Sequence, residues 1–166
     1  MSVNFAVWLD GVILKVDLTD RLYEIYKGGS AELPVTYEAF EDALRFLERV
    51  SRSNDVVVMS PYDESTTRSI MERLNLDFDY VANEGRTKPS RTPYEKLFSI
   101  KNWDPLDTFT VGASPLDLLS TRFYDSRIKV ICVNRFVDCS RYSPYLMVSD
   151  LDEAVERLTR LKKVQL

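Results

Sequence analysis

Short apolar runs alternate with amphipathic segments along almost the whole chain of 166 residues. A strand buried on both faces of a sheet gives a continuous apolar run, and parallel neighbours need a crossover, which is usually a helix. The alternation therefore predicts an α/β fold of three layers, in which a Rossmann-like, doubly wound and mainly parallel sheet lies between helices. This length suits one hydrophobic core, so we expect a single domain over residues 1–166.

The elements can be placed from hydrophobic periodicity and from the residues that start helices. The predicted strands are Asn4–Leu9, Asp55–Ser60, Tyr80–Ala82, Thr108–Gly112, Ile128–Val133 and Leu146–Val148. The predicted helices are Tyr37–Ser51, Glu64–Leu74, Pro93–Ser99, Pro115–Phe123 and Leu151–Leu161.

A different pattern occupies the segment between the first strand and the first of these helices. Leu14–Leu18 and Arg21–Tyr26 each alternate apolar and polar residues, and Thr19-Asp20 lies between them. This pattern predicts a β-hairpin within residues 13–35. The segment is too short to hold a separate domain as well.

Composition excludes several classes of function. The chain has no histidine, which removes histidine-based triads and histidine-containing zinc sites. Its net charge is −4, so nucleic acid is an unlikely partner. No apolar stretch is long enough to span a membrane and no secretory signal is evident, so we expect a cytoplasmic protein. Two cysteines do not form a disulfide scaffold: Cys132 is interpreted as a buried strand residue and Cys139 as a loop residue.

Polar residues follow several of the predicted strands in a distinctive order. Asp10-Gly11 follows the first strand, Ser60 ends the second, and Lys88 precedes Pro89 ahead of a helix. A fourth strand ends in Gly112 and is followed by Asp117. The order and spacing of these four features resemble the motifs of the haloacid dehalogenase (HAD)-like superfamily of phosphotransferases and phosphatases. The resemblance implies a HAD-like fold with a hairpin flap and no cap domain. The site of such a protein would be open, which favours large partners or covering by another subunit.

The resemblance also implies roles for these residues. In the family the first motif is Asp-x-Asp-Gly: the first Asp attacks phosphorus, and the second is the general acid and base. Asp10 matches the second, but Trp8 stands at the nucleophile position. Ser60 and Lys88 match the groups that bind phosphoryl oxygens. The family holds Mg²⁺ partly through the fourth motif, where Asp117 matches one acid and Ala113 replaces the other.

Each of these residues also has an ordinary structural explanation. Asp10 could be a turn residue before Gly11, and Asp117 an exposed acid in the first turn of a helix. Ser60 could simply end a strand, and Lys88 could be a solvated loop lysine. Trp8 could fill the space of an abandoned active site or form part of a new binding surface.

The absence of the family's aspartates at positions 8 and 113 favours a catalytically inactive HAD-like protein, or pseudo-phosphatase. Such a protein would act by binding a macromolecular partner or a phospho-ligand. No cofactor is expected. The alternative is a magnesium-dependent phosphatase or hydrolase of unusual mechanism, with Asp10 or Asp117 as the working carboxylate and Mg²⁺ as its cofactor. A third possibility is a structural subunit, as a homo-oligomer or with a protein partner, through apolar residues such as Tyr142, Tyr145 and Leu146.

Overall fold

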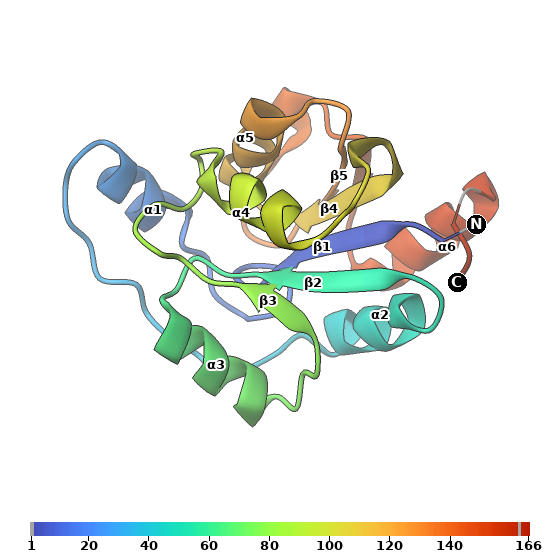
Figure 1. Ribbon diagram of the computed structural model, residues 1–166, viewed down its shortest axis with the longest axis horizontal. Helices are drawn as coiled ribbons and strands as arrows, with labels where there is room; N and C mark the ends of the chain where they lie inside the picture. The colour runs from blue at the N-terminus through green and yellow to red at the C-terminus, as the bar shows by residue number, and fades with distance from the viewer. Residues whose placement is uncertain (1, 163) are drawn as a thin grey trace.

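The computed structural model describes residues 2–162 and 164–166. Its centre is a sheet of six parallel strands in the order β3-β2-β1-β4-β5-β6 (Figure 1). The strands are β1 (Asn4–Trp8), β2 (Asp55–Met59), β3 (Asp79–Val81), β4 (Thr108–Gly112), β5 (Lys129–Val133) and β6 (Leu146–Val148). The strand order reverses beside β1, between β1 and β4. In doubly wound folds such a point is where ligands bind, beyond the carboxyl ends of the strands.

Helices cover both faces of the sheet. They are α1 (Thr19–Tyr26), α2 (Glu41–Ser51), α3 (Glu64–Arg73), α4 (Thr92–Ile100), α5 (Pro115–Tyr124) and α6 (Leu151–Leu161). Helices α2 and α3 lie on one side of the sheet, and α4 and α5 lie on the other (Figure 1). Helix α6 packs against α2. The predicted α/β architecture is therefore confirmed, and two strands and one helix have their predicted bounds.

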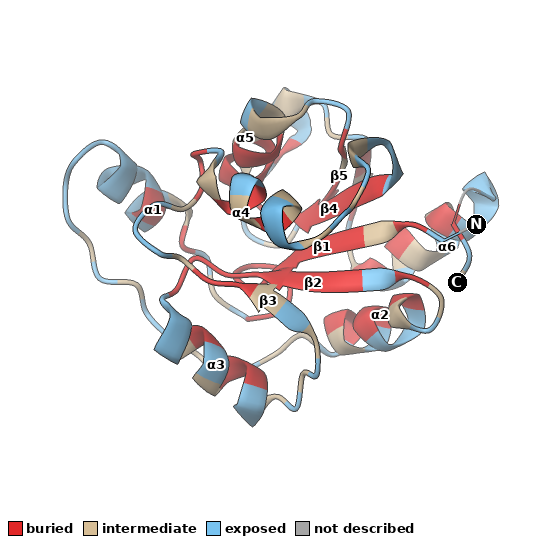
Figure 2. Ribbon diagram, in the orientation of Figure 1, coloured by how far each residue is buried: buried red, intermediate tan, exposed pale blue. Residues whose placement is uncertain are grey.

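The central strands are almost completely buried (Figure 2). Phe5 of β1 packs edge-on against Phe46 of α2 and stacks on Phe109 of β4. This contact joins a helix layer to two strands at the middle of the sheet. Strands buried on both faces need apolar side chains throughout, which explains why the sequence shows continuous runs there and not alternation.

One buried carboxylate joins three distant segments. Asp42 in the first turn of α2 lies 2.9 Å from the guanidinium of Arg135, and both side chains are about nine-tenths buried. Its Oδ2 also accepts a hydrogen bond of 2.8 Å from the backbone N–H of Leu151, at the start of α6. Asp42 thus fixes the loop after β5 and the last helix onto α2.

The predicted β-hairpin in residues 13–35 is wrong. Leu14 forms only isolated bridges, to Asp10 and Ala39, and residues 19–26 form helix α1. Asp17 accepts hydrogen bonds from the backbone N–H and the hydroxyl of Thr19, which stabilises the start of this helix. Leu22 is its one buried residue, and the alternation of the sequence comes from exposed aromatic side chains.

Cys132 lies in a buried strand and Cys139 in a loop, as predicted, but the interpretation of the two as unpaired residues is wrong. Cys132 in β5 and Cys139 in the following loop form a disulfide. Both residues belong to a small buried cluster with Leu118 of α5 and Val130 of β5. Cys139 follows Cys132 at a sequence separation of seven, so the bond fixes the loop after β5 next to α5.

Candidate functional site

Three charged side chains meet at the carboxyl ends of β1 and β4. The Nζ of Lys88 lies 2.9 and 2.8 Å from the two carboxylate oxygens of Asp10. It also contacts Oδ1 of Asp117. The side chains of Lys88 and Asp117 are at most 1 % exposed, and that of Asp10 is 5 % exposed. This cluster, called the triad below, contains one cation and two carboxylates.

Local backbone geometry positions both acids. Asp10 lies in the turn after β1, and Gly11 has a φ of +76°, which favours glycine. Asp117 is the third residue of α5 and forms a capping box with Ser114. Its Oδ2 accepts hydrogen bonds of 2.7 and 3.2 Å from the backbone N–H groups of Ala113 and Ser114. A side chain at Gly112 would lie 2.6 Å from the Cβ of Asp117, so the glycine allows this close approach.

Trp8 forms the wall behind the triad. Its ring is fully buried, and the Nζ of Lys88 lies 4.2 Å from the ring centroid. Its indole N–H donates a hydrogen bond of 3.1 Å to the hydroxyl of Tyr94, which lies 2.9 Å from the hydroxyl oxygen of Thr110. Burial raises the pKa of Tyr94 to about 12, so this hydroxyl stays protonated at neutral pH. Trp8 is therefore a fully satisfied core residue that also faces a cation.

The charges of the triad influence one another. Burial disfavours the charged form of Asp117 more than Lys88 favours it, and the charge of Asp10 acts in the same direction as burial. Together these effects raise the pKa of Asp117 to about 6. Burial opposes the charge of Lys88, but the two carboxylates outweigh it and raise the pKa of the ammonium group. Lys88 is thus positively charged at neutral pH.

The side chains of this site do not fit the Mg²⁺ that the family resemblance implies. Both oxygens of Asp10 contact the ammonium of Lys88, and both oxygens of Asp117 already accept hydrogen bonds. Trp8 and Ala113 supply no oxygen side chain, and Mg²⁺ demands near-octahedral oxygen ligands. Among residues 2–162 and 164–166, no group of three or more His, Cys, Asp or Glu side chains is arranged to hold a metal.

Ser60 lies directly after β2 and is buried. Its hydroxyl oxygen is 2.7 Å from that of Thr67 and accepts a hydrogen bond of 3.1 Å from the backbone N–H of Tyr62. These contacts make Ser60 a structural part of the turn before α3. Burial raises the pKa of the Tyr62 phenol, and the negative charge of Asp10 adds to this effect.

The structure therefore brings some of the predicted site residues together and not others. Asp10, Lys88 and Asp117 are in direct contact, with Trp8 against Lys88. Lys88 is not a solvated loop residue and Asp117 is not an exposed acid, since both are buried. Tyr94 and Thr110 were missed by the sequence analysis, because nothing in an apolar strand or an amphipathic helix marks a residue that hydrogen-bonds to Trp8.

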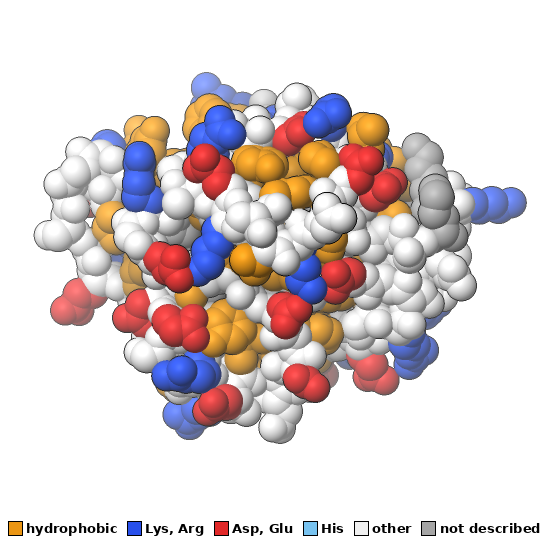
Figure 3. Space-filling model, in the orientation of Figure 1, with side chains coloured by type: hydrophobic (Ala, Val, Ile, Leu, Met, Phe, Trp, Pro, Cys, Tyr) orange, Lys and Arg blue, Asp and Glu red, His pale blue; other side chains and the backbone are white. Residues whose placement is uncertain are grey.

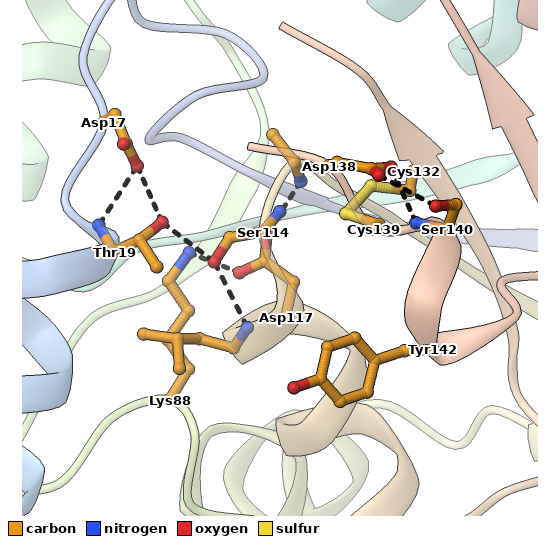
Figure 4. Close-up of a disulfide and its surroundings, with 12 residues drawn as sticks. Asp17, Thr19, Lys88, Ser114, Asp117, Cys132, Asp138, Cys139, Ser140 and Tyr142 are labelled. Carbon is orange, nitrogen blue, oxygen red and sulfur yellow. Dashed lines mark hydrogen bonds and ion pairs between the residues drawn. A yellow bond between two sulfur atoms is a disulfide. The ribbon is translucent and has the colours of Figure 1, made fainter. Parts of the chain in front are cut away.

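The side chains of the triad are shielded from solvent by their surroundings. Helix α1 contacts the start of α5 here: the hydroxyl oxygens of Thr19 and Ser114 lie 2.9 Å apart, within hydrogen-bond distance. Figure 4 shows Thr19, Ser114, Asp117 and Lys88 together, with the disulfide close by.

Comparison with solved structures identifies the fold. A protein from Bacillus subtilis assigned as a HAD hydrolase, YfnB, described as bound to magnesium, is 11% identical with a TM-score of 0.77, covering 95% of this chain and 98% of that one. The HAD-like hydrolase SP0104 from Streptococcus pneumoniae is 13% identical with a TM-score of 0.73, covering 95% and 98%. The L-2-haloacid dehalogenase of Xanthobacter autotrophicus is 13% identical with a TM-score of 0.73, covering 96% and 99%.

The chain has a HAD-like fold. No protein-family model matches the sequence, and a search of curated proteins finds no match. The TM-scores of 0.73 and 0.77 support the HAD-like architecture. The sequence identities of 11% and 13% are too low to show a shared reaction. In the part of the chain that the structure describes, no helix is long and apolar enough to cross a membrane.

Proposed function

We propose that this HAD-like protein is catalytically inactive and acts by binding. The observation that carries this proposal is the placement of Trp8, which is fully buried against Lys88 at the position that the family resemblance gives to the nucleophile. An indole ring has no lone pair that could attack phosphorus, and it fills the space beside the cation. A covalent aspartyl-phosphate route is therefore closed at this position.

The charge distribution of the triad supports the same proposal. Lys88, which the resemblance assigns to phosphoryl oxygens, is already neutralised by Asp10 and Asp117. A phosphate that entered the triad would have to displace a carboxylate from Lys88 and would face the other carboxylate. An anionic ligand is thus more readily bound beside the triad than within it. The cavity that Lys88 lines has a volume of about 140 Å³, so a small phospho-ligand fits it better than a macromolecule does.

The surface offers no strong reason to prefer nucleic acid. Acidic and basic side chains are interspersed on the face shown in Figure 3, and the net charge is −4. Nucleic-acid binding usually depends on a continuous basic surface. A protein partner or a second copy of the chain would be detected by isolation of the protein from its native cells under mild conditions, followed by mass spectrometry and light scattering.

The deciding experiment is a phosphatase assay with p-nitrophenyl phosphate and a panel of phosphate esters, with and without Mg²⁺. We expect no turnover above background, since the loss of a single electrostatic contact to the transition state costs about 100- to 1,000-fold. The alternative function is a magnesium-dependent phosphatase. Turnover that survives repeated purification and disappears in Asp10→Asn would establish that alternative and overturn the proposal.

A constructive variant tests the assigned positions. Trp8→Asp combined with Ala113→Asp should restore an acidic cluster that binds Mg²⁺, whereas the unchanged protein should give no site-specific heat in calorimetry. Circular dichroism would verify that the double variant folds, and Ala113→Asp alone is the milder version. A folded double variant without Mg²⁺ binding would show that Asp10 and Asp117 are not placed as the resemblance implies.

A further inference from the structure

A cavity beside the triad has the properties of a ligand site. Its volume is about 140 Å³, and it lies between helix α1 and the loop that leads to Lys88. Cavities of roughly 150 Å³ accommodate a benzene ring. Side chains of α1 and of the loop after it form the apolar side: Leu22, Ile25, Tyr26 and Leu33. An apolar ring therefore matches this side in both size and chemistry.

The opposite side of the cavity is polar and carries an unpaired positive charge. It consists of Asn83, Gly85, Arg86, Thr87, Lys88 and Ser90. No carboxylate lines the cavity, and the nearby acids Glu84 and Glu95 pair with Lys96 and Arg91. Lys88 is neutralised within the triad, so Arg86 supplies the net charge that a ligand would meet. A guanidinium group binds carboxylate and phosphate oxygens in a bidentate manner.

A second group in the same loop has unused hydrogen-bonding capacity. The hydroxyl oxygen of Thr87 is buried, and it has no hydrogen-bond partner among the described residues. Buried hydroxyl groups without a partner are uncommon in folded proteins and call for an explanation. Thr87 lines the cavity, so a rotation about its Cα–Cβ bond would be needed to turn the buried hydroxyl toward a bound molecule. There it would donate to an anionic oxygen next to Arg86.

We propose that this cavity binds a small aromatic anion, a single ring that carries a carboxylate, phosphate or phosphonate group. The ring lies against Leu22, Ile25 and Leu33, and the anionic group meets Arg86 and Thr87. This inference deepens the proposed binding function, because it names the ligand class for the same edge of the sheet. It requires no attack on phosphorus and no metal.

Binding can be tested with benzoate and phenylphosphonate by NMR titration of the amide groups of Ile25, Arg86 and Thr87. We expect saturable shifts with a dissociation constant in the millimolar range or tighter. Benzyl alcohol, which lacks the charge, and inorganic phosphate, which lacks the ring, should each bind at least about tenfold more weakly. Equal binding of inorganic phosphate and phenylphosphonate would overturn the proposal, as would no saturable binding of either aromatic anion.

Paired variants assign the contacts. Arg86→Gln should weaken benzoate binding about tenfold or more, whereas Arg68→Gln, at an exposed arginine on α3 outside the cavity, should leave it unchanged. Ile25 is exposed enough to be changed without loss of the fold. Ile25→Asp places a negative charge beside the ligand and should abolish binding, whereas Ile25→Leu should retain it. Unchanged affinity in both Arg86→Gln and Ile25→Asp would show that the cavity is not the site.

The result of the ligand-binding test can be separated from the result of the phosphatase assay that tests the proposed function. If benzoate binds but the protein hydrolyses p-nitrophenyl phosphate, the inactive assignment fails and the ligand site stands. If no turnover is found and neither aromatic anion binds, the ligand site fails and the inactive assignment stands.

Discussion

The ammonium group of Lys88 lies 4.2 Å from the centroid of the Trp8 ring, on a side chain that is completely buried. The same cation is held by two carboxylates, so removal of any one member changes the environment of the others. Such a buried cluster is sensitive to substitution, because an unpaired charge in the interior is far more costly than a paired one.

Replacement of Trp8 should show how much of the core depends on it. Trp8→Ala should lower the free energy of unfolding by about 3–5 kcal/mol, because it leaves a large cavity. Trp8→Phe keeps a ring against Lys88 and loses only the indole hydrogen bond, so a loss nearer to 1 kcal/mol is expected beyond the change in packing. Urea denaturation followed by circular dichroism measures both. A cost below about 1 kcal/mol for Trp8→Ala would contradict a core role.

Removal of the cation should be strongly destabilising. Lys88→Met leaves Asp10 and Asp117 buried without their partner, which should cost about 3–5 kcal/mol at pH 8. The matched control is Lys96→Met, because Lys96 pairs with Glu84 at the surface. That change should cost less than about 1 kcal/mol. Equal effects of the two substitutions on the urea midpoint would show that the triad contributes no more than a surface pair.

The raised pKa of Asp117 predicts an unusual pH dependence. Its pKa is about 6 in the folded protein and 3.8 when unperturbed, so between these values the folded state binds more protons than the unfolded state. Its contribution to stability therefore falls as pH rises from about 4 to 6, by on the order of 3 kcal/mol. Stability curves of the unchanged protein and of Asp117→Asn at several pH values measure this contribution. A contribution that rises with pH over this range would refute the assignment.

The disulfide should stabilise the loop after β5. It closes a short loop, since Cys132 and Cys139 are seven residues apart, and the chain-entropy estimate for such a loop is roughly 2 kcal/mol. Dithiothreitol should lower the free energy of unfolding by about this amount. Cys132→Ser combined with Cys139→Ser should have the same effect and make the protein insensitive to dithiothreitol. A reductant effect that persists in this double variant would rule out the disulfide as its source.

The sheet could be predicted from sequence because burial on both faces leaves a strong signal. Thr108–Gly112, which is rich in β-branched and aromatic residues, and the apolar run Leu146–Val148 are segments whose predicted strand bounds the structure reproduces. Helix α6 was predicted with its observed bounds, since Asp150 caps it and its buried face repeats with helical spacing. Helix α2 begins at Glu41 and not at Tyr37, because the residues before it are extended and the backbone N–H of Phe40 bonds to the carbonyl of Ile13.

The site was predictable only as a set of positions. The ends of β1 and β4 must lie side by side in a parallel sheet, so the approach of Asp10 to Asp117 followed from topology. Three-dimensional contacts decided the rest. Local alternation in residues 14–26 could not distinguish a hairpin from helix α1, whose exposed aromatic residues Tyr23 and Tyr26 stack on each other. The pairing of Cys132 with Cys139 depends on where the loop after β5 returns, which no local pattern records.

The contacts of Asp42 bear on the order in which a newly synthesised chain can complete its fold. Its partners Arg135 and Leu151 follow it by 93 and 109 residues. Translation proceeds from the N-terminus, so α2 leaves the ribosome long before either partner exists. Until these partners are synthesised, the carboxylate of Asp42 must stay hydrated, so α2 cannot pack with that side chain buried. The loop after β5 and helix α6 therefore complete a buried contact that the chain before Arg135 cannot form by itself.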